Sequence, residues 1–157
     1  MPKTTPCLWF DTEAEEAAEF YTSLFSNSQV TDVTRYGDAG PGEKGSVLTV
    51  SFDLDGSSFV GLNGGPGHSS FTEAISFQID CEDQAEVDHY WDAFADGGEE
   101  MACGWVKDRF GLCWQVIPRR LPELIGNADP EVATRAMNAM LTMTKIDVAA
   151  LEDAARG

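Results

Sequence analysis

The chain has 157 residues, 43% hydrophobic and 24% charged, a balance that is ordinary for a folded globular protein. Its 27 acidic and 10 basic residues give a formal net charge of −17, which disfavours nucleic acid and anionic membranes as partners. There is no apolar run long enough to span a bilayer and no recognisable export signal, so we expect a cytoplasmic protein.

The first half of the chain predicts a strand, a helix and three more strands. Residues 5–10 read as a short apolar strand, and Asp11 and Thr12 supply a helix-capping signal after it. Apolar residues at helical spacing predict a helix over 13–25, with glutamates in its N-terminal half as the helix dipole favours. Further strands are predicted over 29–36, 46–54 and 58–63, with a glycine-rich loop at 37–45 and a hairpin turn at Asp55-Gly56.

The second half repeats this order after a linker at 64–70 that contains His68. A clean alternation predicts a strand over 73–81, and a buried aromatic stripe predicts a helix over 84–95. Strands over 99–102, 105–109 and 112–117 follow. In the last of these, Gln115 is a polar residue between apolar ones, which indicates either the wall of a concave site or a hairpin residue that faces solvent.

The last part of the chain, 121–157, is predicted to be a helical tail. A helical turn at 121–125 is followed by a helix over 131–143 with Pro130 at its first position, and by a last helix over 147–155. The apolar stripe of the middle helix needs a surface to pack on, and we expect the tail to pack as an arm across a dimer. This stripe consists of Val132, Ala136, Met140 and Met143.

These elements predict an α+β fold with two tandem βαβββ modules, 5–63 and 73–118, in a single domain with the helical tail. Stretches across the chain resemble one known family: 8–25 (LWFDTEAEEAAEFYTSLF), 64–66 (GGP), 76–77 (SF), 104–118 (GWVKDRFGLCWQVIP) and 139–151 (AMLTMTKIDVAAL). They are similar to the PhnB-like, or demethylubiquinone methyltransferase-like, family of the vicinal-oxygen-chelate superfamily. That superfamily includes glyoxalase I, extradiol dioxygenases and bleomycin-resistance proteins.

The resemblance implies that each module curls into a glyoxalase-like half-barrel, with its helix outside and a ligand cavity inside. It also implies that sites form between paired modules, commonly in a homodimer. The superfamily's divalent metal is held by His, Glu or Gln, and the matching positions here are approximately Thr5, Gly61, Ala74 and Gln115. Since only Gln115 has a metal-capable side chain, we expect no cofactor, with a divalent metal as the minor alternative.

Strand parity within these modules predicts the residues that line the cavity. Trp9, Phe59 and Trp105 are expected to form an aromatic wall for a planar or apolar ligand, or else simply to fill a small cavity. The full predicted lining is Cys7, Trp9, Phe59, Asn63, Ser76, Gln78, Trp105, Cys113 and Gln115.

No catalytic residue can be assigned from the sequence. The four cysteines have no CxxC spacing and no histidine partner in sequence reach, and we expect His89 on the solvent side of its helix. Asp108 is expected to cap the turn at 108–111, while Glu73 and Asp80 lie outside the cavity by parity. No G-x-G-x-x-G directly follows a predicted strand, so S-adenosylmethionine binding is not expected.

Two classes of function therefore remain open. One is a protein that binds or transforms a small organic molecule without a stable metal. The alternative is a ligand-sequestering protein like the bleomycin-resistance relatives, or a metal-dependent lyase, isomerase or dioxygenase of the superfamily.

Overall fold

A computed structural model describes residues 2–67 and 70–157. The chain divides into two compact units, residues 1–69 and 70–157, and each is described by itself. His68 of the predicted linker lies outside the described residues. Within the described ranges, no helix combines the length and the apolar character needed to cross a membrane.

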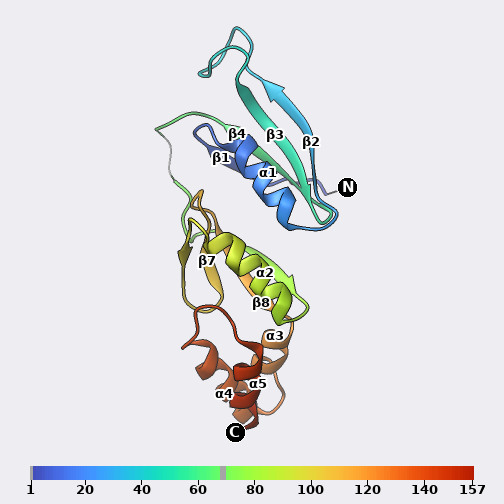
Figure 1. Cartoon of the computed structure of the whole chain (residues 1–157), viewed down its shortest axis with the longest axis vertical. Coiled ribbons are helices and arrows are strands. Elements are labelled where there is room, and N and C mark those ends of the chain that lie inside the picture. Colours follow the sequence, from blue (N-terminus) through green and yellow to red (C-terminus); the bar gives the residue numbers. More distant parts are fainter. Residues whose placement is uncertain (1, 68–69) are drawn as a thin grey trace. The chain divides into compact units, whose positions relative to one another are not determined.

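The first unit packs one helix against an open four-stranded sheet (Figure 1). The strand order is β1-β4-β3-β2, in which β1 and β4 run parallel and the other neighbours run antiparallel. Its elements are β1 (Cys7–Phe10), α1 (Ala14–Leu24), β2 (Gln29–Arg35), β3 (Val47–Leu54) and β4 (Ser57–Asn63). The βαβββ order predicted for this half is confirmed.

The second unit repeats this topology, with strand order β5-β8-β7-β6 and a parallel β5–β8 pair. Its sheet elements are β5 (Phe77–Cys81), α2 (Gln84–Ala95), β6 (Glu99–Glu100), β7 (Trp105–Lys107) and β8 (Cys113–Pro118). β5 is shorter than the predicted strand at 73–81 because its ladder with β8 begins at the pair Phe77–Trp114. The predicted α+β class is confirmed, as two open sheets.

Each helix covers one face of its own sheet because its apolar stripe must leave water. In α1, Ala17, Ala18 and Tyr21 are buried, and the Tyr21 ring lies 6.1 Å from the ring of Phe52 on β3. In α2, Val87, Tyr90, Trp91 and Phe94 are buried in the same way. The opposite face of each sheet is not covered by its helix, and it is called the open face below.

The N-terminus of α1 is capped from a distant strand. The backbone N–H of Ala14 donates to Oδ1 of Asn63, at the end of β4, over 2.9 Å. The sequence had indicated Asp11 and Thr12 as capping residues, but the N-cap position is Glu13, whose side chain makes no capping bond. A cap drawn from another strand leaves no local sequence signal, so this prediction was wrong.

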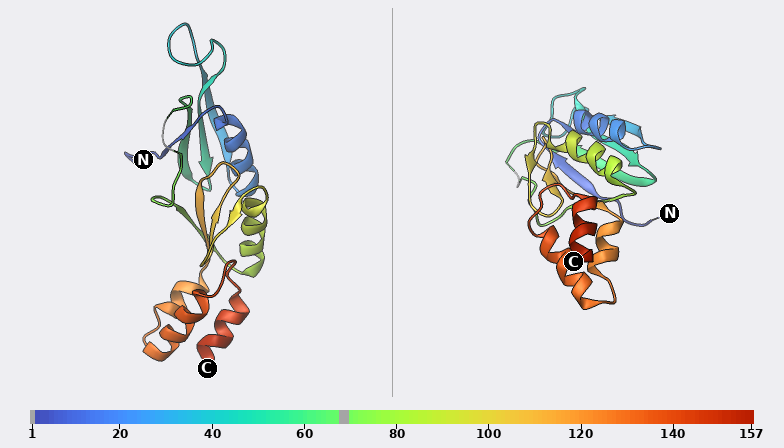
Figure 2. Two further views of the ribbon diagram at one scale, coloured as in Figure 1. Left: turned by 90° about the vertical axis from the view of Figure 1, so that its left-hand side faces the viewer. Right: turned by 60° about the horizontal axis from the view of Figure 1, so that its bottom comes forward.

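The tail consists of α3 (Arg120–Ile125), α4 (Pro130–Met140) and α5 (Val148–Arg156), which lie together in the second unit (Figure 2). Their apolar side chains form a core of their own, joined by Ile117 of β8. The expected stripe therefore packs within its own chain, and the prediction that it needs a partner surface was wrong. The buried members are Leu121, Leu124, Ala136, Ile146, Leu151 and Ala155.

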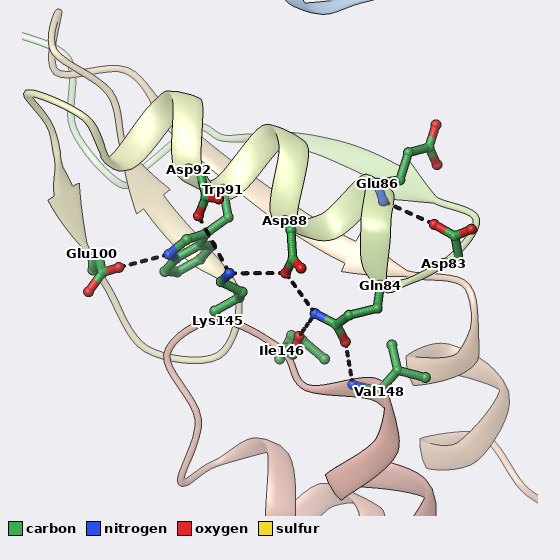
Figure 3. A network of polar contacts seen from close by, with 10 residues as sticks. All are labelled: Asp83, Gln84, Glu86, Asp88, Trp91, Asp92, Glu100, Lys145, Ile146 and Val148. Carbon is green, nitrogen blue, oxygen red and sulfur yellow. Dashed lines mark hydrogen bonds and ion pairs between the residues drawn. The ribbon is translucent and has the colours of Figure 1, made fainter.

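A polar network fastens the tail to α2 (Figure 3). Lys145 Nζ lies 3.0 Å from Asp88 Oδ1 and 3.5 Å from Asp92 Oδ1. The Gln84 side chain donates to Ile146 O over 3.1 Å and accepts from Val148 N over 2.8 Å. Gln84 therefore satisfies one backbone group just before α5 and one at its first residue, which fixes where the last helix begins.

Candidate functional site

The open face of the second sheet brings together the residues that the sequence predicted for this module. Trp114 of β8 stacks on Phe94 of α2, with ring centroids 4.7 Å apart, so its strand neighbours Cys113 and Gln115 point to the opposite face. The ladder register adds further residues to that face. Gln115 pairs with Gln78 on β5 and with Trp105 on β7, while Cys113 pairs with Lys107.

Gln115 is held by hydrogen bonds to two neighbours on this face. Its Nε2 donates to Ser76 Oγ over 2.8 Å, and its Oε1 accepts from Gln78 Nε2 over 3.3 Å. These two bonds use one N–H and one lone pair of the Gln115 amide, which has two of each. The network fixes the orientation of the amide and leaves it capacity for a ligand.

Charged groups on the same face pair with one another. Lys107 Nζ lies 3.5 Å from Glu73 Oε1 and 3.9 Å from Glu99 Oε2. A backbone hydrogen bond and the Lys107 charge lower the pKa of Glu73, so its carboxyl group stays ionised near neutral pH. A carboxylate in this state cannot serve as a general acid at neutral pH.

Two cysteine thiols of this unit, those of Cys81 and Cys113, are not activated. Cys113 is fully buried, and desolvation, with the charge of Glu73 as the next cause, raises the pKa of its thiol. Burial raises the pKa of Cys81 to about 12. The thiolate is the nucleophilic form of cysteine, so neither side chain is set up for nucleophilic catalysis.

Asp108 organises the turn before β8, as the sequence predicted. Its Oδ1 accepts from the backbone N–H of Phe110 at 2.8 Å and of Leu112 at 3.0 Å. Its Oδ2 also accepts from Trp114 Nε1 at 2.9 Å, a contact that local sequence gave no signal for. Asp108 is 3% exposed, so its role is to fix β8 and the side chains that β8 carries.

In the first unit, the predicted parity of β4 was wrong by one residue. Phe59 stacks on Phe52 of β3 at 5.5 Å, and a Cβ added to Gly61 would lie 3.1 Å from the Ala14 Cβ. Phe59, Gly61 and Asn63 therefore belong to the side that α1 covers, away from the Cys7 and Trp9 side chains. Parity cannot be carried through a helix and two turns, because a register shift of one residue reverses the face.

The register assigns other residues to the open face of the first sheet. Cys7 lies beside Val60 and Trp9 beside Leu62 in the parallel β1–β4 pair. The Trp9 indole N–H donates to Gly65 O over 3.0 Å, and its ring occupies the space that a Cβ on Gly64 would need. Trp9 thus holds the start of the glycine-rich linker against the sheet.

A cavity of about 420 Å³ lies on the other side of this unit, next to Asn63. The Tyr36 hydroxyl donates to Asn63 O over 2.6 Å, and the loop at 37–45 folds over the Tyr36 ring. The predicted lining residue Asn63 therefore borders a cavity, although Cys7 and Trp9 do not contribute to it. The lining is Asp11, Thr12, Glu15, Tyr36, Pro41, Gly42, Glu43, Ser46, Val47, Asn63 and Gly65.

The residues present do not fit a divalent metal. Of the four positions that match the superfamily's ligand pattern, Gly61 has no side chain, Ala74 has no donor atom, and Thr5 offers a hydroxyl on an exposed segment. Throughout residues 2–67 and 70–157, no group of three or more His, Cys, Asp or Glu side chains is placed to hold a metal ion. His89 is exposed on α2, as predicted.

Comparison with known proteins adds the family. A family model described as 3-demethylubiquinone-9 3-methyltransferase matches residues 2–117. The chain belongs to this family. Its predicted membership of the PhnB-like family is confirmed, and the matched residues take in both βαβββ modules. The match ends at Ile117, so α3, α4 and α5 lie beyond it.

Two solved structures agree in fold with this chain. The PhnB protein of Bacillus cereus is 34% identical, with a TM-score of 0.69 over 74% of this chain and 99% of that chain. A Pseudomonas aeruginosa protein shares the fold at 17% identity, with a TM-score of 0.64 over 75% of this chain and 98% of that chain. No curated protein matches the chain.

Proposed function

We propose that this PhnB-like protein binds a small organic molecule on the open face of its second sheet, without a resident metal. The observation that supports this most directly is the hydrogen-bonded set Ser76–Gln115–Gln78 beside Trp105. Oriented polar groups next to an aromatic ring are the usual composition of a small-molecule site. The half-buried Trp105 offers a flat apolar surface, which favours a planar ligand.

We propose binding as the main role because the titratable groups on this face are unsuited to catalysis. The Cys113 pKa is raised and the Glu73 pKa is lowered, so neither group changes its protonation state near neutral pH. A protein with such a site would act by sequestering its ligand, in the manner that the family resemblance suggests for bleomycin-resistance relatives.

Methyl transfer has no support from the glycine-rich loop. Residues 40–45 (GPGEKG) do match the spacing G-x-G-x-x-G, but they join the antiparallel strands β2 and β3. The dinucleotide motif needs a helix N-terminus after its glycines, and none follows here. Gly42 has a local explanation, because a Cβ there would overlap the Tyr36 ring.

We also propose that the protein forms a homodimer in which modules pair. The family resemblance supports pairing, and so do the outer strands of each sheet, β1 and β2 in one and β5 and β6 in the other. An outer strand presents backbone groups that can pair with another strand.

The binding function is tested with purified protein in two steps. Metal analysis is expected to give far less than one equivalent, and stoichiometric Zn, Mn, Fe or Ni would show that a metal site exists. A thermal-shift screen against aromatic metabolites and thiol conjugates then seeks ligands. If no compound raises the unfolding temperature, the binding function is rejected.

The site is tested by Gln115→Ala. We expect weaker ligand binding, with only about 0.5–1.5 kcal/mol lost from the free energy of unfolding, because the Gln115 side chain is half-buried. Gln29→Ala, at an exposed glutamine on β2, is the control and should change neither. A large loss of stability in Gln115→Ala would identify Gln115 as a core residue instead.

A further inference from the structure

The hydrogen bonds through Gln115 have a direction. Gln78 donates to the carbonyl of Gln115, and the amide nitrogen of Gln115 donates to the Ser76 hydroxyl. Both hydrogen bonds therefore point the same way. They run from Gln78 on β5, through Gln115 on β8, to Ser76 just before β5. Hydrogen bonds aligned in this manner polarise one another and strengthen both ends.

The two ends of this hydrogen-bonded set, Ser76 and Gln78, offer different hydrogen-bonding groups to a ligand. The Ser76 oxygen accepts from Gln115, and no acceptor for its own proton lies among the residues that the structure describes. At the other end, Gln78 uses its amide nitrogen, which leaves its carbonyl oxygen able to accept. Ser76 can thus donate its proton to a ligand, and Gln78 can accept at its carbonyl oxygen, beside one remaining N–H.

The charges on the face favour a neutral ligand. Lys107 is near two carboxylates, those of Glu73 and Glu99, so the local balance repels an anion. The Cys113 thiol is uncharged because its pKa is raised. Trp105 lies directly across from Gln115 on β7, on the side of β8 away from Gln78, and adds a flat apolar surface next to this polar set.

From these features, and on the basis of the binding function proposed above, we infer the chemical class of the ligand. It is a neutral, flat aromatic molecule with a carbonyl group at one end, which accepts from Ser76, and a hydroxyl or amino group at the other, which donates to Gln78. A molecule with acceptors alone would satisfy the Ser76 end and leave the Gln78 carbonyl without its partner.

Three probes of nearly the same shape test this class with the full-length protein. 4-Hydroxyacetophenone carries both groups, acetophenone carries only the carbonyl, and phenol carries only the hydroxyl. Titrations are followed by NMR at the side-chain amide signals of Gln78 and Gln115, which locates binding on this face. We expect each single-group probe to bind about three- to tenfold more weakly than 4-hydroxyacetophenone.

Two variants assign each end of the ligand to its residue. Ser76→Ala should reduce the affinity for 4-hydroxyacetophenone to that for phenol, while phenol binding is unchanged. Gln78→Ala should reduce the affinity for 4-hydroxyacetophenone to that for acetophenone, while acetophenone binding is unchanged. Ser58→Ala, an exposed serine on β4, is the matched control and should leave all three affinities as they are. Such paired comparisons isolate one contact at a time.

The outcomes separate this inference from the binding function. Equal affinities for the three probes on this face would overturn the ligand class and leave the binding function standing. If none of the three probes moves the amide signals, the ligand class is overturned as well. The metabolite screen then decides the binding function separately. Circular dichroism of the variants shows that a lost interaction is not lost folding.

Discussion

Gly104, just before β7, is a residue at which the chain packs closely against the segment between α4 and α5. Its N–H donates to Thr144 O over 2.8 Å, and the N–H of Cys103 donates to Met143 O over 2.9 Å. Gly104 has a φ of +83°, and a Cβ there would lie 3.0 Å from Val116 O and 3.1 Å from Ile146 Cγ1. Only glycine accommodates both the backbone conformation and the contact.

We expect Gly104→Ala to lower the free energy of unfolding by about 2–4 kcal/mol, since it adds steric overlap to backbone strain. Gly111→Ala is the control, because Gly111 has a similar φ of +91° but open space around it. The free energy of unfolding of that variant should fall only by the cost of backbone strain, about 1–2 kcal/mol. Urea unfolding measures both, and equal losses would show that packing at Gly104 contributes nothing.

At the scale of elements, the tail is fastened to α2 by an ion pair that can be removed without disturbing a core. Lys145 and Asp88 affect each other's ionisation consistently. The pKa of Asp88 is lowered by a hydrogen bond from Gln84, the largest cause, and by one from Lys145. The pKa of Lys145 is raised by its hydrogen bond to Asp88. The Asp88 contribution is therefore present at neutral pH and is lost as the pH falls through its lowered pKa.

Lys145→Met should loosen the tail while the sheets stay intact. We expect a loss of about 1 kcal/mol or less, because the three side chains are partly exposed, and a smaller loss in high salt. Hydrogen exchange should become faster in α5 and remain unchanged in β8. Lys44→Met removes a 2.8 Å pair with Asp38 whose side chains are 72% and 87% exposed, and it should have no effect. Unchanged exchange in α5 would show that the ion pair does not hold the tail.

The sequence predicted the elements well, and it predicted the face on which a strand residue lies only in part, for physical reasons. Alternation within β8 placed Cys113 and Gln115 together on the face away from Trp114, and the structure agrees because both lie on one continuous strand whose other face packs on α2. Phe59 and Asn63 were assigned to the wrong face because the ladder register between β1 and β4 is set by tertiary pairing. The Asn63 cap and the Trp114–Asp108 bond join residues that local periodicity does not relate.

At the scale of the whole molecule, the net charge of −17 bears on self-association. Two copies with this charge repel each other at low ionic strength, and salt screens the repulsion. We therefore expect sedimentation to show a dimer whose affinity rises between about 20 and 300 mM NaCl. A monomer at every salt concentration and at high protein concentration would contradict the proposed homodimer.

The cap that Asn63 places on α1 has a consequence for how the first unit is made. The N–H of Ala14 binds an acceptor 49 residues further along the chain, and β1 pairs with β4, the last strand of its sheet. Neither interaction can form before that later segment has been synthesised. At the usual speed of translation, that stretch takes roughly 2 to 10 seconds to synthesise. We infer that the nascent α1 stays frayed at its first turn until Asn63 leaves the ribosome. On this view, the pairing of β1 with β4 and the bond from Ala14 to Asn63 form last, and they form together.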